Sequence, residues 1–222
     1  MPFLDDTGVD TGERSPLWSP FTIIADQLER LVVLNIVWAI QWLPALAVFG
    51  WPELPLVVRV VLISYTLIAY APATVVLYGM VRLAAQGEPL TVFLATDLLK
   101  TRGLDGAKAL MPLVGLIGLL ILGSGVPVTV ISAVCQLALL FVLVFSNYWG
   151  VLIAARDLRN PVMLLVESAR LVWHYPAQTL LVTGAVLIAV VLGTISVGGW
   201  VLIVPVVIAL LQTQMFRSLM EK

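Results

Sequence analysis

Long intervals without a charged residue constrain this chain more than any other feature. A helix needs about 20 apolar residues to cross a bilayer core of about 30 Å, and a charge inside that core is costly. The intervals Arg30 to Glu53 and Arg59 to Arg82 each enclose 22 uncharged residues, which suffice for one crossing. Lys108 to Arg156 encloses 47 and Arg170 to Arg217 encloses 46. Each of these longer intervals has room for two crossings and a tight turn.

Glycine-rich turns divide the two long intervals and give a total of six predicted spans. The turns lie at Gly123 to Pro127 and at Gly193 to Gly199. The predicted spans are 28–49, 56–84, 105–123, 127–155, 177–193 and 199–217. We expect the six spans to form three consecutive hairpins within a single membrane domain, residues 19–222. Residues 1–18, which precede this domain, are expected to form a disordered acidic N-terminal tail.

Composition indicates the same class. Hydrophobic residues make up 61% and charged residues 11% of the 222 residues, against about 45–50% and about 25% in soluble domains. The apolar runs are continuous and lack the alternation of barrel strands, which predicts an all-α polytopic membrane bundle. A net charge of -1 argues against nucleic acid as a partner, because phosphate binding needs clustered basic residues.

The basic residues predict the orientation of this bundle. On the six-span map, eleven of the twelve Lys and Arg residues fall on the side of the two termini, and Arg59 alone lies near the other side. Cytoplasmic loops of membrane proteins carry an excess of Lys and Arg. The pattern therefore predicts that both termini are cytoplasmic.

A similar segment precedes each predicted hairpin. It begins at Ser19-Pro20, Glu88-Pro89 and Asn160-Pro161, with prolines 69 and 72 residues apart. Proline is favoured at the first position of a helix, so each dipeptide predicts a helix start. We interpret the segments as short amphipathic helices at the membrane interface, with Leu90, Phe93, Leu94 and Leu98 of the second facing inward. Either a true threefold repeat or shared helix-start chemistry explains the pattern.

Uncharged polar residues within the predicted spans are the candidate functional positions: Asn35, Gln41, Gln136, Asn147 and Gln212. Such side chains either hold helices together through hydrogen bonds or line a path for a neutral solute.

Two further positions are structural candidates. Arg59 either extends to the headgroups or contacts a ligand or lipid phosphate. Pro72 predicts a kink or restart in the second span.

The sequence carries no motif of a hydrolase, metalloprotease or phosphate-binding loop. His174 is the only histidine and Cys135 the only cysteine. We therefore expect no enzymatic activity, cofactor or metal.

Short motifs between Leu31 and Leu110 resemble a known family. They are Asn35-Ile36-Val37-Trp38, Leu43-Pro44, Phe49-Gly50, Ala71-Pro72-Ala73-Thr74, Leu77-Tyr78, Arg82-Leu83 and Gly87-Glu88. This set resembles the YesL-type bacterial integral membrane proteins, domain of unknown function 624. The resemblance implies a multi-pass protein of the bacterial plasma membrane that assists carbohydrate uptake. Its expected partners are the lipid bilayer and a sugar transporter component or a second copy of the chain.

Three functions remain open at this point. The first is a membrane accessory or scaffold associated with carbohydrate uptake. The second is a small channel or facilitator for a neutral solute. The third is a membrane enzyme that acts on lipid or glycan headgroups through Asp97, Asp157 and Glu167.

Overall fold

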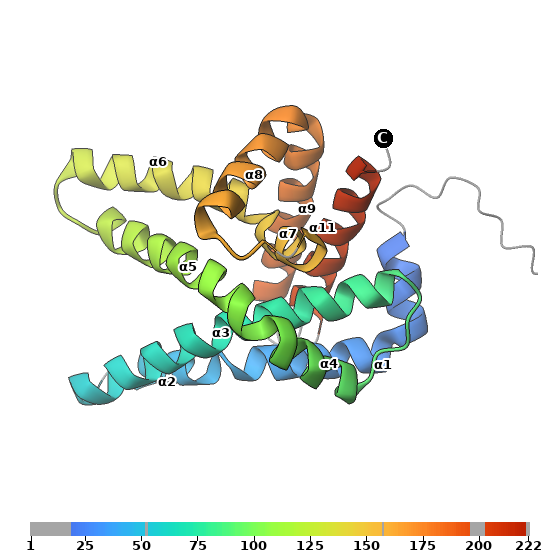
Figure 1. The fold of residues 1–222 in the computed structure, drawn as a ribbon. Helices are drawn as coiled ribbons and strands as arrows, with labels where there is room; N and C mark the ends of the chain where they lie inside the picture. The colour runs from blue at the N-terminus through green and yellow to red at the C-terminus, as the bar shows by residue number, and fades with distance from the viewer. Residues whose placement is uncertain (1–18, 52, 157, 196–202, 221–222) are drawn as a thin grey trace, which may run out of the picture.

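The computed structural model describes residues 19–51, 53–156, 158–195 and 203–220 (Figure 1). The acidic tail predicted at 1–18 lies outside these residues. The described part is helical and contains no strand. Its elements are α1 (Ser19–Ile40), α2 (Leu43–Gly50), α3 (Leu56–Ala85), α4 (Val92–Leu98), the π-helix η1 (Leu99–Gly103), α5 (Leu104–Ser124), α6 (Thr129–Ser146), α7 (Trp149–Arg156), α8 (Pro161–His174), α9 (Pro176–Ile195) and α11 (Val204–Met220).

Four helical stretches in the described residues are long and apolar enough to cross a membrane: Leu56–Ala85, Val92–Ile121, Thr129–Arg156 and Pro176–Gly193. This agrees with a membrane protein. The other two predicted spans differ from single long helices for separate reasons. The first is divided between α1 and α2 at Gln41 and Trp42, and the last corresponds to α11, a shorter apolar helix that follows the undescribed residues 196–202.

In the core, α3, α7 and α11 pack against one another. Most buried residues of α3 come from its C-terminal half, whereas nearly all of α7 and most of α11 are buried. Around these three helices, α5 packs against α3, α1 against α11 and α9 against α11. The centre of the fold is therefore formed by three helices that are distant in sequence.

The α5–α6 pair extends away from this core (Figure 1). The two helices pack against each other, and α6, all of which is described, has no buried residue. Large apolar side chains such as Leu119, Val130 and Leu140 are exposed along the pair. In a membrane protein such side chains face lipid, so the pair needs no protein cover.

A local departure from the α-helix follows each of the three short segments that precede the predicted hairpins. Gln27 within α1 has φ -127° and ψ 24°. The π-helix η1 follows α4, and Tyr175, with φ -129° and ψ 58°, separates α8 from α9. Each short segment can therefore take a direction different from the helix that follows it.

The helix start predicted at Asn160-Pro161 is confirmed, because the Asn160 side chain accepts hydrogen bonds from the amides of Val162 and Met163. The start predicted at Glu88-Pro89 is wrong. There α4 begins at Val92, and the Thr91 hydroxyl accepts a hydrogen bond from the Leu94 amide. The helix begins after Thr91 and not at Pro89, because the threonine hydroxyl can accept a hydrogen bond from a first-turn amide and proline has no such group.

The inward face predicted for this second segment is correct in part. Leu90 is buried, and Leu94 and Leu98 pack against the core. Phe93 is 82% exposed and does not pack against the protein core, so its orientation toward the membrane stays a prediction. It lies next to Leu94 along α4, and adjacent helical residues do not share a face.

Of the kink or restart predicted at Pro72, the restart is excluded because α3 continues through this residue as one helix, and the kink stays a prediction. Proline removes one backbone hydrogen bond, and tertiary contacts hold the helix on both sides of it. Ala71 and Val75 are buried in the core. Thr74 donates to the Tyr70 carbonyl and accepts from Trp38 Nε1 at 3.1 Å, which ties this stretch to α1.

Gly150 sets the distance between α3 and α7. A Cβ atom at this position would overlap the ring of Tyr78. That ring is buried and its hydroxyl is hydrogen-bonded, so it has little room to move. The two helices can approach this closely only because residue 150 has no side chain.

We predict that Gly150→Ala destabilises the protein by about 1–3 kcal/mol, the usual cost of overpacking a core. Thermal unfolding of the purified protein, followed by tryptophan fluorescence, measures the change. The matched control is Gly184→Ala in α9, where an added Cβ meets nothing within 4 Å. Equal unfolding temperatures for the two variants would contradict the close contact at Gly150.

Candidate functional site

A buried amide, Gln212, joins the three central helices. It lies on α11 and is 5% exposed. Its Oε1 accepts a hydrogen bond from the Tyr78 hydroxyl of α3, and its Nε2 donates to Asn147 Oδ1 at 3.0 Å. Asn147 lies in the short link between α6 and α7. One side chain therefore connects three segments that are each more than 60 residues apart in sequence.

The same network continues to α9. Asn147 Nδ2 donates to Thr183 Oγ1 at 3.0 Å and to the Val144 carbonyl at 3.1 Å. The neighbouring Tyr148 shares a hydrogen bond of 2.8 Å with Thr179. These groups satisfy one another inside the protein, as buried polar groups must when water is absent.

Asn35 has a separate structural role. It is completely buried on α1, and its Oδ1 accepts a hydrogen bond of 3.1 Å from the Val206 amide. Val206 lies in the first turn of α11, where backbone N–H groups have no partner within the helix. The Asn35 side chain therefore caps α11 from a neighbouring helix.

The remaining candidate positions do not join this network. Gln41 donates to the Val37 carbonyl of its own helix. Gln136 is exposed on α6 and donates to Ser132 of the same helix. Arg59 lies in the first turn of α3, half-buried, and its Nε has no hydrogen-bond partner among the described residues. Of the five polar candidates, Asn147 and Gln212 come together.

Three arginines at the C-terminal ends of the central helices form a ring. Arg82 of α3 donates to the Ala154 carbonyl of α7 at 2.5 Å. Arg156 of α7 reaches α11, where it donates to Met220 Sδ at 3.3 Å and lies 5.9 Å from the centre of the Phe216 ring. Arg217 of α11 completes the ring with a bond of 3.0 Å to the Ala85 carbonyl of α3. Each cation thus reaches the C-terminal end of the next helix, where the helix dipole favours positive charge.

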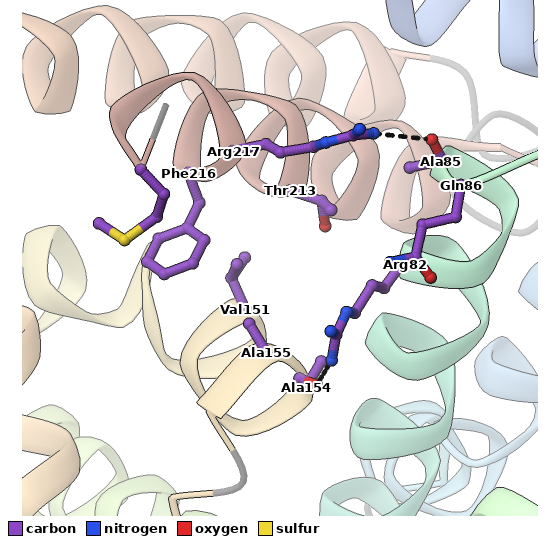
Figure 2. A pocket seen from close by; sticks show the side chains of 10 residues that line it. Arg82, Ala85, Gln86, Val151, Ala154, Ala155, Thr213, Phe216 and Arg217 are labelled. Carbon is purple, nitrogen blue, oxygen red and sulfur yellow. Dashed lines mark hydrogen bonds between the residues drawn. The ribbon is translucent and has the colours of Figure 1, made fainter. Parts of the chain in front are cut away.

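A pocket of about 220 Å³ opens where these helix ends meet (Figure 2). Arg82 and Arg217 border it, Val151, Phe216 and Met220 supply apolar walls, and the described residues that line it include no carboxylate. Figure 2 shows the Thr213 hydroxyl pointing into the space between the two arginines. Thr213 is 7% exposed.

Ion pairs surround this basic end of the bundle. Asp105 contacts Lys108 at 2.9 Å and Arg159 at 2.8 Å. Glu167 contacts Arg156 at 3.0 Å and Arg170 at 3.9 Å, beside a second pocket of about 210 Å³. Asp97 makes no ion pair within the described part of the chain, and Asp157 lies outside that part. Among the described acidic side chains, Asp105 and Glu167 therefore belong to ion pairs at the surface.

Sequence reasoning selected Asn147 and Gln212 because they interrupt apolar runs. It missed their partner Tyr78, and it missed the ring residues Arg82 and Arg217 as a site. A usable signal existed for the arginines, since Arg82, Arg156 and Arg217 each lie in the last turn of a helix. Tyr78 had no such signal, because tyrosine is common in apolar helices.

No protein-family model, curated protein or solved structure matches this chain. The fold therefore defines the class, a helical protein with segments able to cross a membrane.

We predict that Gln212→Leu destabilises the protein by about 1–3 kcal/mol. The substitution leaves the buried Tyr78 hydroxyl and the side-chain oxygen Oδ1 of Asn147 without their hydrogen-bond partner. The matched control is Gln136→Leu, where the amide is exposed and bonds within its own helix. We expect the control to change stability by less than about 0.5 kcal/mol. Unfolding in mixed micelles with increasing denaturing detergent measures both, and equal stability of the two variants would contradict a structural network.

Proposed function

We propose that this protein is a non-enzymatic multi-pass membrane protein that acts as an accessory or scaffold for a membrane transport system. The observation that carries the proposal is the combination of a polar interior used for helix packing with apolar side chains exposed on two short helices. In the interior, Asn35, Asn147 and Gln212 hydrogen-bond to other parts of the protein. These groups stabilise the bundle and are not presented to a substrate or solute.

The proposed contact surfaces lie on two helices, α4 and α8. Phe93 on α4 is 82% exposed and Trp173 on α8 is 85% exposed. Other exposed apolar residues on these helices are Val92, Val162, Met163 and Val166. Charged residues lie close by, including the Glu167–Arg170 pair on α8. Exposed aromatic and apolar side chains beside charges are typical of surfaces that bind a protein partner or the membrane interface.

The partner class rests on the resemblance to YesL-type proteins, which points to a membrane component of a carbohydrate uptake system. In the proposed topology, six spans form three hairpins in the bacterial plasma membrane and both termini are cytoplasmic. Support comes from the ends of the helices. Arg82, Arg102, Arg156 and Arg217 gather at one end of the bundle through shared contacts, and Arg59 lies at the opposite end of α3. A single basic face suits the cytoplasmic side.

Site-specific photocrosslinking in native membranes tests the accessory role. A photoreactive residue at Phe93 or Trp173 should capture a membrane component of a sugar transporter, identified by mass spectrometry. The matched control is Val134 on α6, which is 61% exposed but lies on the helix pair that we assign to lipid. Adducts at Phe93 and Trp173 with none at Val134 are the expected result. If no protein adduct formed at any of the three positions, the proposed accessory function would lose its support.

A further inference from the structure

The pocket at the basic end has the features of a site for a phosphate group. Two arginines from different helices, Arg82 and Arg217, border one cavity of about 220 Å³. Guanidinium groups bind phosphate with several parallel N–H donors, and each arginine has five such donors. On each of the two arginines Nη1 donates to a helix carbonyl, that of Ala154 for Arg82 and that of Ala85 for Arg217.

Thr213 provides a second and independent observation. This side chain is 93% buried, since its exposed fraction is 7%. Its hydroxyl has no hydrogen-bond partner among the described residues, and it points into the pocket between the arginines (Figure 2). The hydroxyl faces the pocket, so a ligand or water there can hydrogen-bond to it. Thr213 can therefore donate to an acceptor inside the pocket.

The shape of the pocket limits the ligand. Cavities for drug-sized molecules measure about 300–1,000 Å³, so a cavity of about 220 Å³ suits a smaller group. One side is cationic, and the other is formed by apolar side chains such as Val151 and Phe216. A phosphate ester that carries a short apolar or polyol portion fits both sides. Basic pockets between membrane helices commonly bind lipid headgroups.

We propose that Arg82, Arg217 and Thr213 bind the phosphate group of a small phosphate ester, either a phospholipid headgroup or a soluble phosphate ester. This site goes beyond the accessory role, which uses α4 and α8. The arginine bonds to helix carbonyls remain in place, because a guanidinium can donate to a carbonyl and a phosphate at once. The ligand thereby links the ends of α3 and α11.

Binding to the purified full-length protein tests the site in two arms. Native mass spectrometry with added phosphatidylglycerol, compared with diacylglycerol, which has no phosphate, tests the lipid source. Isothermal titration with glycerol 3-phosphate and with inorganic phosphate tests the soluble source. Retention of phosphatidylglycerol without binding of the soluble probes assigns a lipid headgroup, and binding of glycerol 3-phosphate in the titration assigns a soluble ester.

Variants locate the binding. Arg82→Gln should weaken the affinity for the bound probe about tenfold or more, because it removes a charge-assisted hydrogen bond. Thr213→Val keeps the shape and removes one neutral donor, so we expect a loss of about two- to tenfold. The control is Lys100→Gln, which removes an exposed positive charge outside the pocket lining and should leave the affinity within about twofold.

Two results would overturn the proposal. The first is that none of the probes binds the wild-type protein. The second is that Thr213→Val, which preserves every arginine bond, binds as tightly as wild type. The arginines would then serve as caps of the helix ends alone. If Arg82→Gln does not fold, Thr213→Val decides the question, with unchanged unfolding temperature as its check.

Discussion

The structure depends on the need of buried polar groups for hydrogen-bond partners where no water is present. Gln212 meets this need with Tyr78 on α3 and Asn147 beside α7, so the three central helices must keep one register. Gly150 permits the close approach that this register requires. Apolar packing alone discriminates weakly between neighbouring arrangements of membrane helices, because lipid is as apolar as the side chains. The amide network therefore supplies much of the specificity of the fold.

The charged end follows from the same principle. The central helices end with carbonyl groups that have no partner within the helix, and arginines from neighbouring helices satisfy two of these ends. The same residues produce the positive charge that predicts orientation in a membrane. In the opposite direction the α5–α6 pair exposes apolar side chains that suit lipid. Function is therefore best sought at the basic end, where arginines from three helices and a pocket meet.

The sequence allowed prediction of the helical class because charge-free intervals report directly on the cost of a charge in lipid. For example, the uncharged interval between Arg59 and Arg82 corresponds to α3. Local breaks were harder to predict. The turn at Gln41 comes just before Pro44 and the link at Asn147 just before Gly150, but both breaks lie inside apolar runs long enough for one uninterrupted span. By contrast, Pro72 leaves its helix unbroken because Trp38 and the core support it. The ring and its pocket combine residues from three distant helices, so only the tertiary arrangement reveals them.

A double-mutant cycle on Tyr78→Phe and Gln212→Leu tests most directly whether the buried amide holds the central helices together. Unfolding free energies of the wild type, both single variants and the double variant give the coupling between the two side chains. Residues that share a hydrogen bond couple by about 0.5–3 kcal/mol, and we predict a value of about 1 kcal/mol. Additive effects, with a coupling below about 0.3 kcal/mol, would contradict a hydrogen bond between α3 and α11.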